Sequence, residues 1–274
     1  MIQRRWVENR PSGGFRRLDL AELWEYRELA GFLALRDLKV RYKQAVFGAA
    51  WAILQPLAGV AVFYFVFRRL ANVPSQGISY PLFAFVGLSV WTYASSATTK
   101  ATQSLVMNSA LVTKVYFPRL LAPLAAVLPG LVDLAVSLCL LAILYPIYNT
   151  APGIAALTLP LWIVALMVVV IGVGLWLGTL NVTYRDINQG ISLVIQLWLF
   201  LSPVAYGSNL VPERLQVLYA VNPMVGVIDG FRWALLGTPW PGWTMAISLA
   251  VGVLMLVTGV AFFQRGERRF ADVI

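Results

Sequence analysis

The sequence predicts an all-α integral membrane protein with six transmembrane helices, and three observations support this fold class. Of the 274 residues, 59% are apolar and only 12% are charged, whereas soluble domains usually carry about 25% charged residues. The mean hydropathy is +0.75. Apolar runs of about 20 residues, the length that crosses a bilayer, recur along the chain. We expect a cytoplasmic segment over residues 1–44, a membrane domain over 45–264 and a cytoplasmic tail over 265–274.

The N-terminal segment ends in a basic block beside the first apolar run. Residues 20–40 have a helical composition but no single clean apolar face. They indicate two short interfacial helices that meet near Gly31, with a solvated helix packed on a partner as the alternative. Lys and Arg beside a first span hold that end on the cytoplasmic side. The residues that mark this junction are Arg36, Asp37, Lys39, Arg41, Tyr42, Gly48 and Trp51.

Six apolar stretches are long enough to be considered as spans. They cover residues 45–67, 80–99, 120–147, 154–180, 191–206 and 243–263. Within residues 207–242, the apolar stretch 217–228 is too short to cross and is interrupted by Pro223. This region predicts a re-entrant pair of outer helices, with an external amphipathic cap as the alternative. This topology places seventeen of the 21 Lys and Arg residues on the side of the two termini, so both termini are expected in the cytoplasm.

The composition disfavours several other classes of protein. The chain has no histidine and one cysteine, Cys139, which excludes His-based triads and internal disulfides. No G-x-x-x-x-G-K-[ST] phosphate loop occurs, so this chain is not expected to bind a cofactor or hydrolyse ATP by itself. The net charge of +9 comes from basic residues beside the spans, where they meet anionic membrane lipids rather than nucleic acid.

One acid, Asp133 in the third expected span, is the clear ionisable group at membrane depth. Such a group marks either a proton site or a hydrogen bond to a neighbouring helix, and the sequence leaves both open. Without a second acid or a histidine to relay protons, the energy source is expected to lie outside this chain.

Aromatic residues make up 13% of the chain and partly gather in the spans. Because sugar rings have apolar C–H faces that stack on aromatic rings, an aromatic-lined conduit would let a polysaccharide slide. The alternative is an aromatic belt at the membrane interface. The candidate path residues are Phe63, Tyr64, Trp91, Tyr93, Trp198, Phe200 and Tyr206.

The loop over residues 108–123 predicts a contact with a separate ATPase. Asn108 or Ser109 is placed to cap a short helix that ends before Pro118. Its apolar residues are expected to be exposed and to need a partner surface, with an interfacial turn as the alternative. These residues are Leu111, Val112, Val115, Tyr116 and Phe117.

Five stretches taken together resemble the ABC-2 type permeases that export polysaccharides such as O-antigen, capsule and teichoic acid. They are RDLKVRYKQ with Gly48, Trp51 and Pro56; VTKVYFPR; LGTLNVTYRDI over 177–187; SPVAYG over 202–207; and Asn222-Pro223 followed by Arg232. The resemblance runs from about residue 20 to the C-terminus and implies the fold of a type V exporter in the inner membrane of a bacterium.

The resemblance also implies partners and site residues. Two copies of the chain would form a channel above two separate ATP-binding subunits, which would hold ATP and Mg²⁺. The coupling helix would include Lys114, Val115, Tyr116, Phe117, Pro118 and Arg119, and a second ATPase contact would include Tyr184, Arg185 and Asp186. Residues 20–41 would form the interface helix. Residues 211–233, with Asn222, Pro223 and Arg232, would gate the outer mouth.

The expected function is therefore the channel subunit of an ATP-driven exporter of a lipid-linked or anionic polysaccharide. Two alternatives remain from the sequence. One is an ABC-2 exporter of small hydrophobic drugs or lipids. The other is a membrane-embedded transferase acting on lipid-linked sugars, which the lack of histidine and of paired carboxylates disfavours.

Overall fold

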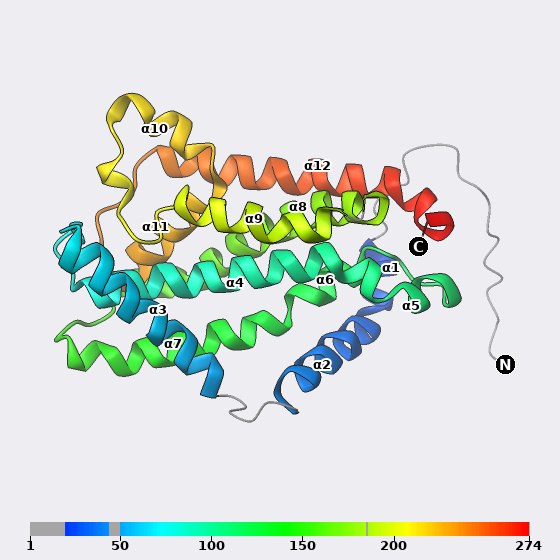
Figure 1. Ribbon diagram of the computed structural model, residues 1–274, viewed down its shortest axis with the longest axis horizontal. Coiled ribbons are helices and arrows are strands. Elements are labelled where there is room, and N and C mark those ends of the chain that lie inside the picture. The colour runs from blue at the N-terminus through cyan, green and yellow to red at the C-terminus, as the bar shows by residue number, and fades with distance from the viewer. Residues whose placement is uncertain (1–19, 44–49, 185, 274) are drawn as a thin grey trace.

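The computed structural model describes residues 20–43, 50–184 and 186–273, and this part of the chain is helical and contains no strand. The helices form an elongated bundle in which α4 (Tyr80–Met107), α8 (Leu159–Thr183) and α12 (Thr244–Val273) run along the long axis (Figure 1). One end carries α1 (Leu20–Glu25) and α5 (Ser109–Lys114), and the opposite end carries α10 (Glu213–Ala220). Gly48 and Arg185 lie outside the described residues.

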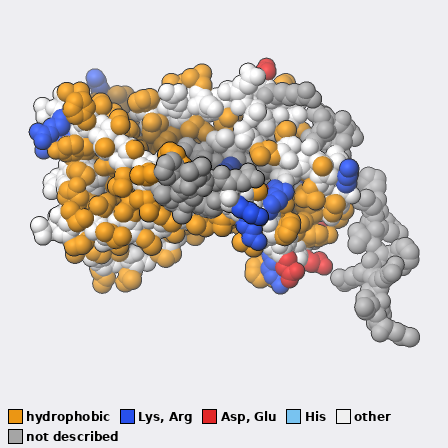
Figure 2. Space-filling view, turned by 60° about the horizontal axis from the view of Figure 1, so that its bottom comes forward, with side chains coloured by type: hydrophobic (Ala, Val, Ile, Leu, Met, Phe, Trp, Pro, Cys, Tyr) orange, Lys and Arg blue, Asp and Glu red, His pale blue; other side chains and the backbone are white. Residues whose placement is uncertain are grey.

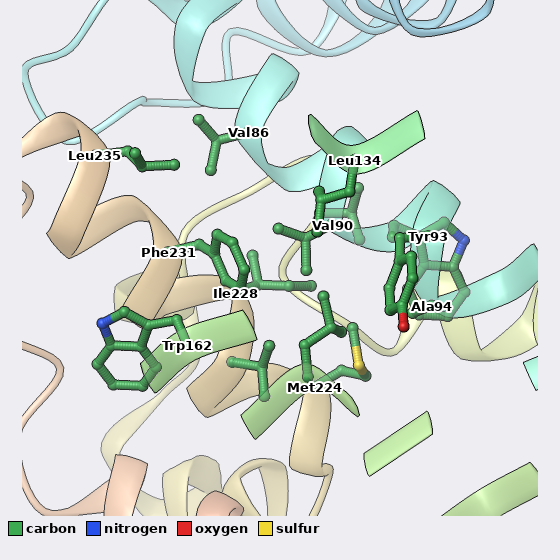
Figure 3. Close-up of a cluster of buried hydrophobic side chains, with 14 of the residues drawn as sticks. Val86, Val90, Tyr93, Ala94, Leu134, Trp162, Met224, Ile228, Phe231 and Leu235 are labelled. Atoms are coloured by element: carbon green, nitrogen blue, oxygen red, sulfur yellow. The ribbon is translucent and has the colours of Figure 1, made fainter. Parts of the chain in front are cut away.

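Helix α4 is the centre of the bundle. It contacts α3 (Ala50–Phe63), α6 (Leu121–Val127), α7 (Pro129–Ile147), α8, α9 (Asp186–Phe200) and α11 (Pro223–Leu236). In the core, Val86 and Val90 of α4 face Ile228 and Phe231 of α11, with Trp162 of α8 beside them (Figure 3). The apolar side chains of these helices therefore enclose one core that runs through the bundle.

Glycine lets α8 approach its two neighbours closely. A Cβ at Gly174 would lie 2.6 Å from the Cβ of Ala101 in α4, and a Cβ at Gly172 would lie 2.7 Å from the backbone nitrogen of Leu256 in α12. Gly178 also faces Ala101 and Thr102. The small-xxx-small spacing of Gly174 and Gly178 thus has the close-packing role that such spacing predicts.

Four segments are long and apolar enough to cross a membrane, which makes this a multi-pass membrane protein. They are Ile53–Leu70, Leu121–Ile147, Ile154–Thr183 and Thr244–Glu267. Helix α4 is 28 residues long but carries many Ser and Thr residues. Most of its surface is covered by other helices, so it needs less hydrophobicity than a lipid-facing span. Helix α9 has 15 residues, fewer than the roughly 20 of a full crossing, and six spans remain a prediction.

Several element boundaries differ from those expected. The first span continues from α3 into a π-helix, η1 (Tyr64–Leu70). The third span is broken between α6 and α7, because Pro129 lacks the amide proton that would continue the helix. The fourth begins with the short helix η2 (Ile154–Thr158) before α8. Helix α9 begins at Asp186 instead of residue 191, and residues 201–206 form turns.

The N-terminal helices meet at a different residue from the one expected. The boundary between α1 and α2 (Arg27–Lys43) lies at Tyr26, and Gly31 is an ordinary helical position inside α2. Backbone hydrogen bonds from Tyr26 N to Glu22 O and from Ala30 N to Tyr26 O, each 3.2 Å, carry the helical path across the boundary. The expectation of a break at Gly31 is therefore wrong. Gly31 has ordinary helical geometry, and a Cβ there would meet no atom within 4 Å, so neither a turn nor a close contact requires glycine at this position.

Residues 207–242 contain η3 (Ser208–Leu210), α10 and α11. Helix α11 is almost wholly buried and packs on α4, α8 and α12, whereas α10 is mostly exposed. Because α11 is buried among these helices, it is not part of an external cap. That α10 and α11 dip into the membrane stays a prediction.

The surface agrees with embedding in lipid. One broad face is mainly hydrophobic, while acidic side chains and a group of basic ones gather toward the end that carries α1 and α5 (Figure 2). Large apolar side chains are exposed on α3, α8, α9 and α12. A soluble monomer rarely exposes so much apolar surface.

Candidate functional site

The short helix α5 and the loop after it form an exposed ledge at one end of the bundle. The helix covers Ser109–Lys114 and ends before Pro118, as the sequence predicts. Residues 115–119 follow it as a bend and a turn, so the expectation that the coupling helix includes Val115 to Arg119 is wrong beyond Lys114. Asn108 precedes it without a side-chain cap: its amide nitrogen donates to Ser104 O at 2.8 Å, and its oxygen accepts from Arg36 at 2.9 Å. The helix is thus joined to α4 and α2 by the residue that was expected to cap it.

The apolar residues of this ledge divide into two groups. Val115 is 50% and Tyr116 55% exposed, and Lys114 is exposed as well. Val112 and Phe117 are buried in a cluster with Leu105 and Leu175. The expectation that all five apolar residues are free to dock is therefore wrong for Val112 and Phe117, which hold the ledge to the bundle. Leu111 and Pro118 are half-buried.

The second expected contact lies at the same end. Val182 of α8 belongs to the cluster that holds Phe117, and Tyr184 beyond it is 60% exposed. Asp186 is exposed at the start of α9. A hydrogen bond of 2.6 Å from Gln103 to Asn188 joins this turn to α4. The fold therefore brings together two surface segments that are about 70 residues apart in the sequence.

Polar contacts also connect α1 and the C-terminal helix to the ledge. The Tyr116 hydroxyl lies 3.1 Å from Glu22 Oε1 in α1. Arg119 donates to the carbonyl oxygen of Glu267 in α12. A displacement of the ledge would therefore move its contacts with α1 and with α12.

The junction between α2 and the bundle explains Asp133. Arg41 of α2 donates to Asp133 Oδ2 of α7, so this acid forms an ion pair between helices. Of the two roles left open by the sequence, the structure supports the bond to a neighbouring helix. Arg36 pairs with Asp37 at 2.8 Å, while Lys39 and Trp51 are exposed. Tyr42 lies in α2.

The candidate path aromatics fall into different environments. Trp91 and Tyr93 are buried in the core, and the Tyr93 hydroxyl donates to Val127 O at the α6–α7 break. Buried rings offer no face to a substrate, so packing describes these two residues better than a conduit. Trp198 is half-buried and stands edge-on to Trp91, with ring centroids 5.6 Å apart.

The other candidates lie nearer the surface. Phe200 of α9 is 61% exposed. Phe63 and Tyr64 are half-buried where α3 meets η1, and the guanidinium of Arg69 lies 5.7 Å from the Tyr64 ring. Tyr206 is half-buried and contacts Tyr219 through its hydroxyl. These rings remain available to a conduit or to an interface.

Residues 201–207, which include SPVAYG, form a turn whose backbone carbonyls accept hydrogen bonds from side chains of α4 and α11. The guanidinium of Arg232, 1% exposed, donates to the carbonyl oxygens of Pro203, Val204 and Tyr206. It also lies 3.5 Å from the centroid of the Phe83 ring. The Tyr80 hydroxyl donates to Ala205 O at 2.8 Å. Arg232 is thus a buried clamp between α11, this turn and α4.

Asn222 is the second clamp. Its side-chain oxygen accepts from Trp198 Nε1 at 2.9 Å and from Met224 N at 3.0 Å, which caps α11. Its amide nitrogen donates to Leu201 O and Ser202 Oγ. Pro223 follows at the first position of α11, where a missing amide proton costs nothing. The contacts of Asn222 and Arg232 therefore hold α11 against α9 and the 201–207 turn, with Pro223 at the start of α11. Their role in an outer gate stays a prediction.

Asp229 is an acid that the sequence reasoning missed. It is 6% exposed and lies one helical turn before Arg232, with Oδ1 3.8 Å from Arg232 Nη1. Asp133 is thus not the only acid in the apolar part of the chain. The spacing of Asp229 and Arg232 at i, i+3 within an apolar stretch is the signal that would have identified the pair.

Comparisons with known proteins show the family of this chain. Residues 28–236 match the family described as "ABC-2 type transporter". The chain is 30% identical over 241 residues to an O-antigen export system permease protein RfbA of Klebsiella pneumoniae, covering 87% of this chain and 92% of that protein. It is 28% identical over 258 residues to RfbA of Myxococcus xanthus, covering 92% and 98%.

A polysialic acid transport protein is a more distant relative. The polysialic acid transport protein KpsM of Escherichia coli is 23% identical over 236 residues, covering 84% of this chain and 88% of KpsM. These relatives are named as permease or transport proteins and not as catalytic enzymes. The match over most of the chain, together with the helical bundle and its exposed ledge, identifies this protein as a member of the ABC-2 type transporter family.

Proposed function

We propose that the chain is the membrane subunit of an ABC exporter that moves a polysaccharide, lipid-linked or anionic, outward across the inner membrane of a bacterium. The observation that carries this proposal is the similarity, over most of the chain, to permeases named for O-antigen export and polysialic acid transport. In this proposal both termini, and the end that carries α1 and α5, face the cytoplasm.

The energy source in this proposal is a separate ATP-binding subunit. The chain lacks a phosphate-loop sequence, and its exposed ledge offers Val115 and Tyr116 beside Tyr184. Two copies of the partner would bind ATP and Mg²⁺, and the ledge would sit in a cleft of each. The ion pair of Arg41 with Asp133 and the bond of Arg36 to Asn108 support a route from this contact to α7 and α4.

A homodimer completes the proposal, with the channel between the two copies. Helix α9 and the residue directly after it present a row of exposed apolar side chains that another copy of the chain would cover. These are Leu193, Val194, Leu197, Phe200 and Leu201.

Deletion of the gene tests the proposal. We expect surface polysaccharide to disappear and its precursor to accumulate inside the cell, with tolerance of hydrophobic drugs unchanged. The complemented strain should regain the polysaccharide. Unchanged surface polysaccharide with lost drug tolerance would instead identify a drug exporter. A chemically altered glycan that still reaches the surface would identify a transferase.

A further inference from the structure

A cavity at the end of the bundle opposite the ledge is not used by the transport role described above. It has a volume of about 230 Å³ and lies among α10, α11 and the loops on either side of them. Its polar and aromatic lining includes Gln76, Asn209, Gln216, Tyr219, Asp229 and Trp240. We name it the α10–α11 cavity.

The aromatic walls of this cavity are held in place by other rings. Trp240 stands edge-on to Trp233, with centroids 4.8 Å apart, and Trp233 stands edge-on to Trp162. Tyr219 also lines the cavity, and its hydroxyl lies 3.1 Å from that of Tyr206. Trp240 is still 55% exposed, so part of its ring is open to a ligand. Two rings whose positions are fixed before binding lose little conformational entropy when they stack on a flat molecule.

The polar groups are also preorganised. Gln76 donates to Asn209 Oδ1 at 2.9 Å, which joins the loop before α4 to the turn before α10. Gly207 leaves room for this pair, because a Cβ there would lie 2.3 Å from Asn209 Oδ1 and 2.7 Å from Gln76 Nε2. Gln216 projects from α10 into the same lining. Amides supply both donors and acceptors, which suits a ligand that carries hydroxyl groups.

Asp229 supplies the buried polar group of the cavity. Its Oδ2 has no hydrogen-bond partner among the described residues, and the Ser208 hydroxyl lies beside the carboxylate. A buried acceptor without a partner costs free energy, which a ligand donor would recover. Since Arg232 lies 3.8 Å from Oδ1 and balances the charge, the site favours a neutral donor such as a hydroxyl over a cation.

We propose that the α10–α11 cavity binds one neutral sugar residue, with its apolar face on Trp240 and its hydroxyl groups on the amides and Asp229. The volume fits this size class, since it lies below the roughly 300–1,000 Å³ of pockets for drug-sized ligands. Such a site would recognise a single unit of a glycan at the end of the transporter away from the ATPase ledge. This inference rests on the proposed polysaccharide export.

Ligand-observed saturation-transfer NMR on the full chain in nanodiscs tests the proposal. The probes are glucose, galactose, mannose, rhamnose and N-acetylglucosamine, each titrated in the millimolar range. At least one sugar should bind the unaltered chain, and its dissociation constant should rise about tenfold in Trp240→Ala, the effect of losing about 1.4 kcal/mol. Gln216→Ala should weaken the same sugar without altering the melting temperature.

The matched control is Trp243→Ala. Trp243 is 64% exposed and close in sequence, but it does not line the cavity, so its variant should bind like the unaltered chain. Absence of binding for all five sugars, or equal losses in the Trp240 and Trp243 variants, would overturn the proposal.

Complementation of the deletion strain separates this inference from the proposed function. If the unaltered chain restores surface polysaccharide but binds none of the sugars, export stands and the cavity is not a sugar site. If deletion leaves surface polysaccharide unchanged while Trp240→Ala still abolishes sugar binding, the site stands and the proposed export function fails.

Discussion

At the residue scale, Arg232 is a buried cation whose partners are mainly backbone carbonyls. A charge inside a protein is costly unless it is hydrogen-bonded and balanced by an opposite charge. Of the guanidinium nitrogens of Arg232, only Nε has no hydrogen-bond acceptor among the described residues. Its two terminal nitrogens donate to Pro203, Val204, Tyr206 and Phe83, and Asp229 lies one turn away. The planar fork of arginine reaches all of these, which a lysine would not.

Replacing Arg232 with methionine should therefore destabilise the chain. The change leaves several buried carbonyls and Asp229 without their partner, a cost of about 3 kcal/mol or more. For a chain of this size, that lowers the melting temperature by roughly 6–12 °C. Thermal unfolding in one detergent measures the shift.

Arg232→Lys keeps the charge but not the planar fork, so its melting temperature should lie between those of the unaltered chain and Arg232→Met. Arg214→Met is the control, because Arg214 is exposed on α10. Equal melting temperatures for the Arg214 and Arg232 variants would contradict the role of Arg232 as a clamp.

At the scale of the element, the ledge illustrates which features a sequence pattern predicts. Asn108 and Pro118 delimit the short helix correctly, since the signals that start and stop a helix are local. A helix of six residues is too short for its apolar periodicity to show which side is buried. The burial of Val112 and Phe117 depends on Leu175 of α8 and Phe270 of α12, which lie far away in the sequence.

Two substitutions on the ledge should have different consequences. Val115→Ser combined with Tyr116→Ser removes exposed apolar contacts, so we expect surface polysaccharide to fall about tenfold or more. The melting temperature should change little, because the contact of Tyr116 with Glu22 that is also lost is exposed to solvent. Phe117→Ser empties a buried site and should cost about 3–5 kcal/mol of stability. The measurements are export in the complemented strain and thermal unfolding of each purified variant.

Either of two outcomes would contradict this division of the ledge. One is normal export by the Val115 and Tyr116 double variant, which would remove the ledge from the ATPase contact. The other is an unchanged melting temperature for Phe117→Ser, which would mean that Phe117 does not anchor the loop.

At the scale of the whole molecule, the exposed apolar row on α9 is expected to be buried against another protein surface. Helix α9 is 15 residues long and packs on α4 and α8 only along one side. Leu193, Leu197 and Phe200 point away from the bundle, each at least 55% exposed. A helix too short to cross a bilayer by itself is better covered by protein than by lipid, which agrees with the proposed homodimer.

Cysteine cross-linking in native membranes tests whether a second copy of the chain packs on α9. With Cys139 replaced by serine, Leu197→Cys, in the middle of the exposed row, should yield a disulfide-linked dimer on oxidation, because a residue close to the two-fold axis of an interface meets its own copy. Ile143→Cys on α7, 62% exposed, is the control and should stay monomeric. A dimer from Ile143 but not from Leu197 would move the interface away from α9.

The sequence by itself determined the fold class, the family resemblance, the ledge and most helix positions, because hydropathy, proline and basic residues act within a few turns of the chain. Only the tertiary structure decided the partner of Asp133, the buried clamp of Arg232 and the pairing of Gln76 with Asn209. Arg41 is 92 residues from Asp133, and Arg232 is 149 residues from Phe83. Contacts over such separations depend on how whole helices pack, and a local pattern of residue types carries no record of that packing.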